Sequence, residues 1–474
     1  MRLSAGSTQV LTQAEMDRIH AATLRILAEM GMWIENDRLL QHLEGFGCEV
    51  DYARQRARFP APLVERFIAD SDKADWEDRE ASMSASSGVY RTLYHDPEGG
   101  NLVEWTEERL VRYFALARSL SNIGRASMLG CPLPGVPARL EPLYERLYCW
   151  KYGADDSGTI HLDELCPYIY ELHQVRAEHQ RKRVEDVFRG TAYLVPPLKL
   201  GRHEAYQYMY FYERGLQVHL GDMYAMGATA PVTAAGAVAL NLAECFAVGI
   251  LQRAFFGGTS FALHTSLSPL DMRTLIYPYG RPELALTSLA TACMARYYGL
   301  PGSGHAGLSD AKLPSVEAGY QKALTAIPTL LAWGSVHMDT GLLSIDEVCS
   351  PLQMILDNEF LGALKHLAAG MQVDEETLAL DSILQAGPGG NYMALEHTAR
   401  HFRTALWEPS VWSRLMLSSW FEQGRKLDVD YARDLYRAMS PDLDIEPRIS
   451  REEEADVRAL IQRARSELGA WAEG

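Results

Sequence analysis

The stretch from Gly227 to Asp357 constrains the fold of this chain more than any other part. Short runs of small residues at candidate strand ends are followed by alanine-rich helices, and polar residues gather at the junctions. Candidate strands and helices alternate from about residue 125 to a last strand near 382–390. This alternation predicts βαβ units and a parallel sheet. About eight such units favour an α/β fold with a closed (β/α)8 TIM barrel, with a doubly wound open sheet as the alternative.

The pattern predicts three regions along the chain. Residues 1–87 form an N-terminal helical extension with a hairpin, and Thr12–Glu15 has the pattern of a helix capping box. Residues 88–424 form the barrel, in which Ser344–Glu347 matches a second capping box. Residues 425–474 form charged C-terminal helices that pack on the outside of the barrel.

Charge and cysteine content exclude several classes of protein. The formal net charge of −17 argues against nucleic-acid binding, which usually needs a basic face, and suits a cationic substrate. Seven cysteines without a C-x-x-C pair fit a reducing compartment rather than a disulfide scaffold. We find neither a signal-peptide core nor a membrane-length apolar run. The sequence therefore predicts a cytoplasmic protein that acts away from membranes.

Histidine spacing gives little support to a metal centre. The fourteen histidines include no H-E-x-x-H motif and no histidine–cysteine ligand pair. His397 and His401 lie four residues apart, so they share a helix face and could bind a metal, although a surface or cavity-lining pair of histidines is the favoured explanation. We expect no bound metal.

Polar residues at the predicted strand ends are the better candidates for chemistry. His305, Asp310 and Lys312 share one loop, His337 ends another strand, and Glu283 opens a helix. A parallel barrel keeps its active site at these carboxyl ends of its strands. Each residue also has a structural explanation: Glu283 suits a helix dipole, Asp310 and Lys312 could form a local ion pair, and His337 could be a core histidine.

Aromatic residues at loops and strand ends form a second group. The faces of such rings attract an alkylated ammonium ion, and several together can form a cage, although ordinary packing explains each of them equally well. The group comprises Tyr94, Tyr224, Tyr277, Tyr279, Trp333 and Tyr392. In an acidic protein, it favours a small cationic ligand.

Several phrases, taken in order, resemble the trimethylamine methyltransferase superfamily of corrinoid-protein methyltransferases along nearly the whole chain. They are LTQAEMDRIHAATLRILAEMGMWIEN, APVTAAGAVALNLAE, SDAKLPSVEAGYQKA and GPGGNYMALEHTARHFRTALWEP. The resemblance implies a (β/α)8 barrel. The trimethylamine branch of this family carries pyrrolysine in the segment that corresponds to residues 341–347. This chain has GLLSIDE there, without pyrrolysine. Ile345 is the residue that corresponds to pyrrolysine by its spacing from Asp357. The chain therefore resembles the branch without pyrrolysine, whose members demethylate quaternary amines such as glycine betaine.

The resemblance implies a methyltransferase that moves a methyl group from a quaternary amine to Co(I) of a corrinoid, giving a tertiary amine and methyl-Co(III). The corrinoid (cobalamin) is carried by a cognate corrinoid protein. A quaternary ammonium departs as a neutral amine, so the enzyme needs no acid for the leaving group and contributes positioning and exclusion of water. A homo-oligomer is also expected. The alternatives are a metal-dependent barrel lyase or hydrolase and a non-catalytic betaine-binding homologue.

The same resemblance suggests roles for the candidate residues. The predicted catalytic residues are His337, Asp96 and Glu283. His337 would bind the polar end of the substrate, and the two carboxylates would serve its cationic end or orient polar groups. The predicted substrate-binding residues are Tyr94, Tyr224, Trp333, His305 and Tyr392. The residues predicted to face the cofactor are Asp310, Lys312 and His397. We expect His337→Ala to abolish methyl transfer without unfolding the protein.

Overall fold

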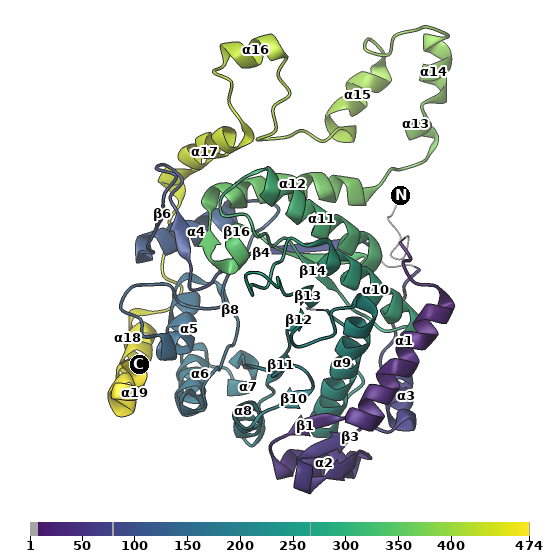
Figure 1. Cartoon of the computed structure of the whole chain (residues 1–474). Coiled ribbons are helices and arrows are strands. Elements are labelled where there is room, and N and C mark those ends of the chain that lie inside the picture. The colour runs from purple at the N-terminus through teal and green to yellow at the C-terminus, as the bar shows by residue number, and fades with distance from the viewer. Residues whose placement is uncertain (1–7, 78–79, 266, 474) are drawn as a thin grey trace.

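Parallel strands surround the centre of the molecule, and helices cover them on the outside (Figure 1). A computed structural model describes residues 8–77, 80–265 and 267–473. It confirms the α/β class. The largest sheet is parallel throughout, and its strands in spatial order are β14 (Gly304–Ala306), β15 (Ser335–Asp339), β4 (Ser82–Val89), β7 (Ala126–Met128) and β8 (Asp155–Asp156).

Two smaller parallel sheets continue the arrangement. They pair β9 (Thr191–Tyr193) with β11 (His219–Gly221), and β12 (Tyr224–Met226) with β13 (Leu267–Pro269). None of these sheets closes into a barrel within the described residues, so the predicted closed (β/α)8 barrel is not confirmed.

Two mixed sheets lie beside the parallel ones. The first runs β16 (Leu342–Leu343), β17 (Val348–Cys349), β5 (Leu93–His95) and β6 (Leu102–Val103). The second runs β10 (Lys199–Leu200), β1 (Met32–Ile34), β3 (Arg56–Arg58) and β2 (Glu49–Asp51). The second sheet ties the N-terminal region to the main body, because β10 comes from the middle of the chain.

The outer helices agree closely with the sequence pattern. They are α4 (Glu107–Ser119), α5 (Glu141–Tyr152), α6 (Cys166–Gln180), α8 (Arg202–Tyr212), α9 (Ala234–Phe256), α10 (Pro282–Tyr298), α11 (Val316–Trp333) and α12 (Pro351–Ala369). Among the described residues, α9 alone is long and apolar enough to cross a membrane, but 78% of its apolar window is buried inside the protein. A helix that is apolar on all sides is expected in the core of a large protein.

Terminal segments pack on this body. The predicted Thr12 capping box is present at the start of α1 (Gln13–Arg25), which packs on α9. Helices α2 (Asp37–Phe46) and α3 (Ala61–Asp70) follow it. At the other end, α17 (Asp428–Met439) packs on α12, and α18 (Arg451–Leu468) packs on α5 and α6.

Residues 371–427 form an arm, most of which projects from the body (Figure 1). Near its middle it packs on α12, where the Val411 amide donates to Glu359 at 3.0 Å. Its helices are α13 (Glu375–Leu378), α14 (Leu380–Ala386), α15 (Glu396–Ala405) and α16 (Leu417–Glu422). One prediction is wrong within the arm: the expected strand near 382–390 is helical up to Ala386. Leu380, Ile383 and Leu384 follow a helical period, which a short apolar run does not distinguish from a strand.

The first strand of the parallel set is β4, which begins before residue 88 and which the sequence pattern missed. Its residues, SMSASSGV, are mostly small and polar, a composition with low strand propensity. β4 is nevertheless a strand because β15 and β7 pair with it on both sides.

The predicted capping box at Ser344–Glu347 is also wrong as a helix start. The Ser344 hydroxyl does donate to Glu347 at 2.6 Å, but the N-cap of α12 is Ser350, whose side chain accepts from the Gln353 amide. Residues 344–346 instead form a separate turn.

Candidate functional site

A cavity of about 400 Å³ lies at the carboxyl ends of the parallel strands. Its aromatic and polar side chains come from the strands, from the loops beside them, and from helices α10 and α11. They include Tyr90, Thr159, His161, Tyr193, Met223, Thr265, Tyr277, Tyr279, Ser288, His305, Thr325 and Asp346. A mostly apolar pocket of this size with a few polar groups is typical of a small-molecule site.

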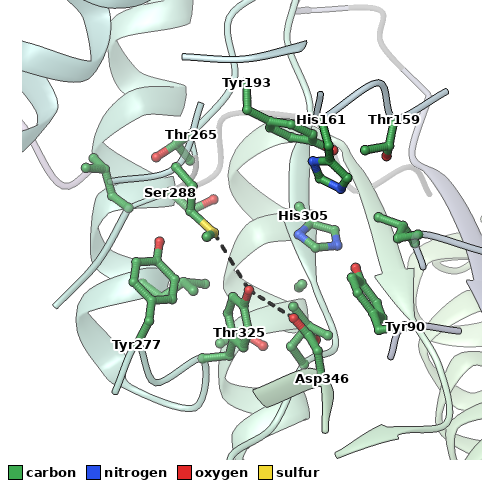
Figure 2. Close-up of a pocket in the computed structure, with 17 residues that line it drawn as sticks. Tyr90, Thr159, His161, Tyr193, Thr265, Tyr277, Ser288, His305, Thr325 and Asp346 are labelled. Carbon is green, nitrogen blue, oxygen red and sulfur yellow. Dashed lines mark hydrogen bonds between the residues drawn. The ribbon is translucent and has the colours of Figure 1, made fainter. Parts of the chain in front are cut away.

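The side chains divide into groups around the cavity. Figure 2 shows Tyr90, His305 and Asp346 together on one side, and His161 near Tyr193 on another. The rings of His161 and Tyr193 stack with their centroids 6.1 Å apart. The cavity therefore combines aromatic faces with one carboxyl group and two imidazoles.

Two histidines on neighbouring strands share the Asp339 carboxylate. His305 on β14 is the register partner of His337 on β15. His305 Nε2 lies 2.6 Å from Asp339 Oδ2, while His337 Nε2 lies 3.8 Å from Oδ1. The His337 ring is also held by the hydroxyls of Ser84 and Ser86, at 2.9 and 3.1 Å. His305 lines the cavity, and His337 lies behind it in this network.

The pKa values of the two imidazoles are shifted in opposite directions. Burial alone would lower the pKa of His305, but the nearby Asp339 carboxylate more than offsets this, so the pKa is raised. Burial prevails at His337, whose pKa is lowered. Burial would raise the pKa of Asp339, but His305 holds it below its usual value. Of the two imidazoles, His305 beside Asp339 is therefore the more readily protonated, and His337 favours the neutral form.

Asp346 supplies the carboxyl group of the cavity. Ser344, Ile345 and Asp346 all have left-handed backbone angles, with φ of 52°, 59° and 82°. Such a conformation is unfavourable for a β-branched residue and persists only where the surroundings enforce it. Here the amides of Ser344 and Ile345 donate to the carbonyls of Ala311 and Ser309 at 2.8 and 3.1 Å.

The turn places the Asp346 carboxyl group beside the cavity with one oxygen unsatisfied. Oδ2 accepts a hydrogen bond from the Tyr279 hydroxyl at 3.2 Å. Oδ1 is buried and has no hydrogen-bond partner among the described residues. Burial raises the pKa of Asp346 to about 7, and the Asp339 carboxylate adds to the rise. A buried carboxylate oxygen without a partner is costly, so this position favours a cationic ligand.

Asp310 positions the Tyr279 side of the cavity. Its two carboxylate oxygens accept from the amides of Tyr279 and Gly280, at 2.7 and 3.0 Å. Its own amide donates to the Gln321 side chain at 2.8 Å. Asp310 therefore braces the loop that carries Tyr279, whereas Lys312 is exposed.

Several residues that the sequence assigned to the site lie elsewhere in the structure. Tyr94, Tyr224 and Trp333 are buried in the core. Tyr94 packs on Trp105, and Trp333 lies behind the cavity, where its Nε1 donates to Ser288 Oγ at 3.0 Å. Strand register decides which face a side chain takes, and the sequence pattern did not determine it.

The remaining predicted residues are structural or belong to the arm. Asp96 accepts from the amides of Glu98 and Gly99 in the β5–β6 turn. Glu283 lies in the first turn of α10, 3.5 Å from Arg281. Tyr392 and His397 belong to the arm, where His397 Nε2 lies 3.1 Å from the Glu376 carbonyl oxygen. Of the residues predicted to be catalytic, substrate-binding or cofactor-facing, His305 alone lines the cavity within the described part of the chain.

The sequence did not predict four residues that line the cavity, namely Asp346, Tyr90, His161 and Tyr193. Only Asp346 had a signal in the sequence, because it directly follows Ile345 in the segment that corresponds to the pyrrolysine segment of the family, residues 341–347. Tyr277 and Tyr279 were noted as loop aromatics, and both line the cavity.

Comparison with known proteins places the chain in a family. The sequence pattern of the family described as trimethylamine methyltransferase (MTTB) matches residues 174–469. A glycine betaine methyltransferase of Desulfitobacterium hafniense is 28% identical over 97% of this chain and 98% of its own length. A trimethylamine methyltransferase of the same species is 24% identical over 96% of this chain and 94% of its own length. One from Methanosarcina mazei is 25% identical over 90% of this chain and 89% of its own length.

Proposed function

Because the chain belongs to the trimethylamine methyltransferase family, we propose that it transfers a methyl group from a small quaternary ammonium carboxylate, with glycine betaine as the prototype, to Co(I) of a corrinoid carried by a partner protein. The observation that carries this proposal is the unpaired, buried Oδ1 of Asp346 in a tyrosine-lined cavity.

The cationic end of the substrate would lie beside Asp346. A quaternary ammonium donates no hydrogen bond, so it is recognised by ring faces and by opposite charge. Tyr90, Tyr277 and Tyr279 supply the rings, and Asp346 supplies the charge. Ile345, at the position matching pyrrolysine, offers no reactive group, which suits a substrate that is already activated by its positive charge.

The carboxylate end would lie against His305. The raised pKa of His305 favours its protonated form, in which both ring nitrogens donate. Nε2 is bound to Asp339, so Nδ1 is the nitrogen that would donate to a substrate carboxylate. A zwitterion would thus pair each of its charges with an opposite one.

The chain's own contribution to the reaction would be positioning and desolvation. Positive charge on the ammonium nitrogen falls as the methyl group leaves, so an apolar, tyrosine-lined cavity favours the transition state over the charged substrate. Asp346 acts in the opposite sense, since its negative charge stabilises the charged ground state most. Its proposed role is therefore binding and orientation, with methyl transfer assisted by exclusion of water.

The methyl acceptor is proposed to approach over the rim of the cavity, where its Co(I) would supply the nucleophile. Met223, which lines the cavity, is 52% exposed. Met272 and Leu275 are each 70% exposed in the loop that leads directly to Tyr277 and Tyr279. An exposed apolar rim of this kind fits a macrocycle carried by a protein partner.

We further propose that the three parallel sheets are arcs of one (β/α)8 ring. Two isolated parallel bridges support this, Thr159 with Thr191 and Leu263 with Gly302, because each joins the end of one sheet to the start of the next. The chain also runs from β11 directly into β12, which pair with different neighbours.

Two further expectations stay proposals. A homo-oligomer would cover apolar side chains of the arm such as Leu384, Met393 and Met416, which are 69%, 84% and 76% exposed.

All seven cysteines are free and buried, which suits the proposed cytoplasmic location.

An anaerobic methyl-transfer assay tests the proposed function. The protein is mixed with cob(I)alamin, with and without a corrinoid protein, and with glycine betaine, choline or trimethylamine. We expect methylcobalamin to form with glycine betaine and not with trimethylamine. A protein that binds glycine betaine but never methylates cobalt would instead be a non-catalytic homologue.

The pH dependence of activity should follow Asp346. Its carboxylate is the form that attracts a cation, and its pKa is raised to about 7. We therefore expect kcat/KM for glycine betaine to rise with pH through about 7 in the wild type. Asp346→Asn should remove this rising limb. A rising limb that persists unchanged in the variant would assign it to another group.

Replacement of His305 should affect substrates according to their charge. His305→Gln removes the positive charge that faces the substrate carboxylate, so we expect KM for glycine betaine to rise at least about tenfold, the result of losing about 1.5 kcal/mol from a charged hydrogen bond. Choline, which has no carboxylate, should be nearly unaffected. Equal losses for both substrates would show that His305 acts on the structure of the site instead.

A further inference from the structure

A second cavity, of about 720 Å³, lies against helix α9 and contains a group of metal-ligating side chains. It shares no described lining residue with the first cavity. Asp222 and His264 face this second cavity, whereas their neighbours Met223 and Thr265 face the first. The two cavities therefore lie next to each other along these two segments, and each is lined by its own residues.

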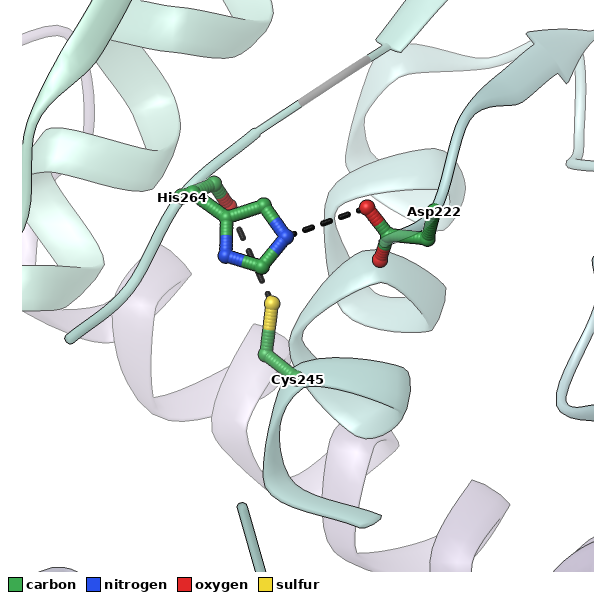
Figure 3. A group of neighbouring side chains, drawn as sticks. All are labelled: Asp222, Cys245 and His264. Atoms are coloured by element: carbon green, nitrogen blue, oxygen red, sulfur yellow. Dashed lines mark hydrogen bonds and ion pairs between the residues drawn. The ribbon is translucent and has the colours of Figure 1, made fainter. Parts of the chain in front are cut away.

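Asp222, Cys245 and His264 converge beside this cavity (Figure 3). They come from the segment between β11 and β12, from α9 and from the segment before β13. Each offers one ligand atom, and these atoms lie within 4.8 Å of one another. His264 Nε2 is 3.0 Å from Asp222 Oδ1. Two ligand atoms about 2.0 Å from a tetrahedral zinc ion are about 3.3 Å apart, so small side-chain shifts would suffice.

Two buried acceptors beside the group lack a hydrogen-bond partner among the described residues. The Asp222 side chain is 4% exposed, and Glu244, next to Cys245 on α9, is fully buried. Glu244 Oε1 and Asn241 Oδ1 are buried without a hydrogen-bond partner among the described residues. Arg253 also lines the cavity, but its guanidinium donates to Phe67, Ser71 and Thr259. Unsatisfied buried acceptors of this kind favour a bound cation.

We propose that Asp222, Cys245 and His264 bind one zinc-type divalent metal ion, with water from the cavity at the fourth position. Thiolate, imidazole and carboxylate together are a donor set that suits zinc. Binding displaces the thiol proton of Cys245 to solvent, and the metal–sulfur bond replaces the S–H bond. The ion would tie α9 to two strand segments. The proposal does not depend on the proposed methyl transfer.

The other group of potential ligands in the described chain is a weaker candidate. Glu376, His397 and His401 lie on the exposed arm. Arg400 Nη1 lies 2.9 Å from the same Glu376 oxygen that His401 contacts at 2.8 Å. A cation is already present there, so a metal ion would have to compete with it.

The sequence did not predict this metal site, because its ligands are far apart in the chain and form no short motif. Asp222 and His264 are 42 residues apart, and Cys245 and His264 are 19 apart. The fold alone brings them together.

Titration with Co²⁺ under anaerobic conditions tests the proposal on the full chain, after dialysis against a chelator. We expect one Co²⁺ per chain, a thiolate-to-cobalt charge-transfer band in the near ultraviolet, and displacement of Co²⁺ by Zn²⁺. Cys245→Ser should lose the band, and His264→Gln should bind at least about tenfold more weakly. Cys293→Ser, which changes another buried cysteine on α10, is the matched control.

Thermal unfolding of each variant without metal establishes that it is folded before titration. Added Zn²⁺ should raise the unfolding temperature of the wild type and of Cys293→Ser, and leave that of Cys245→Ser unchanged. The proposal is overturned if the wild type shows no saturable binding at one ion per chain. It is equally overturned if the band persists in Cys245→Ser or disappears in Cys293→Ser.

Discussion

Asp346→Asn should raise KM for a quaternary ammonium substrate at least about 30-fold while kcat stays unchanged or increases. Loss of one partner of a desolvated charge pair costs about 2 kcal/mol or more, which is about 30-fold in affinity. The kcat should not fall, because the carboxylate stabilises the charged substrate more than a transition state in which that charge is declining. Steady-state kinetics above pH 7.5 measure both quantities, where Asp346 is mostly ionised.

The variant is expected to fold normally. Asparagine adopts left-handed angles such as the φ of 82° at position 346 more readily than most residues. The native carboxyl holds its proton more tightly when folded than when unfolded, because its pKa is raised to about 7. Its contribution to stability therefore falls as pH rises from about 4 to about 7, and Asp346→Asn should remove this loss.

Asp381→Asn, on the exposed helix α14, is the control and should leave KM and kcat unchanged. A large fall in kcat for Asp346→Asn with unchanged KM would contradict the binding role. It would indicate that Asp346 acts only in the transition state.

Loss of Lys322 should destabilise the fold by about 3–5 kcal/mol, because it would leave the Asp357 carboxylate buried without its partner. The two side chains are 2% and 3% exposed, and Lys322 Nζ lies 2.9 Å from Asp357 Oδ2. Lys322 also donates to the carbonyl of Gly307. We therefore expect Lys322→Met to lower the free energy of unfolding in urea far more than an average substitution.

Asp357 connects this ion pair to the site. Its Oδ2 accepts from the Gly341 amide at 2.8 Å, and its Oδ1 accepts from Gln353 at 2.8 Å. Gly341 leads through β16 into the turn that presents Asp346. Asp357→Asn should therefore reduce both stability and substrate affinity.

A double variant and a surface control distinguish this pair from ordinary packing. Lys322→Met with Asp357→Leu should be less destabilised than the sum of the single variants, because neither charge is then left alone. The exposed pair Arg25 and Glu29, 3.0 Å apart, is the comparison, and Arg25→Ala should cause no measurable change. Additive losses at Lys322 and Asp357 would show that their mutual interaction contributes little.

Local signals predicted the helices well and the strands less well. Pro282 and Gly299 bound α10 at the residues expected, since proline suits a first turn and glycine adopts the left-handed cap. The strand β4 carried no such signal, because its serines form a strand only between the neighbours that pair with it. Its identification required tertiary contacts.

The candidate site also contains some residues that local sequence signals predicted and others that depend on tertiary contacts. The sequence located polar residues at strand ends, and His305 lines the cavity there. It could not tell which aromatic residues turn inward, so the buried Trp333 and the cavity-lining Tyr279 seemed equivalent. Asp346 was missed because its importance arises from a left-handed turn and from burial, which no local pattern shows, and only its place after Ile345 in the segment 341–347 pointed to it.

Binding of glycine betaine and of 3,3-dimethylbutanoate, measured side by side by isothermal titration calorimetry, tests the central claim most directly. The second compound has the same shape and carboxylate but a neutral carbon in place of the ammonium nitrogen. If Asp346 and the tyrosine rings recognise the cation, glycine betaine should bind at least about 30-fold more tightly to the wild type. This preference should shrink sharply in Asp346→Asn. Equal affinities of the wild type for both compounds would contradict the account.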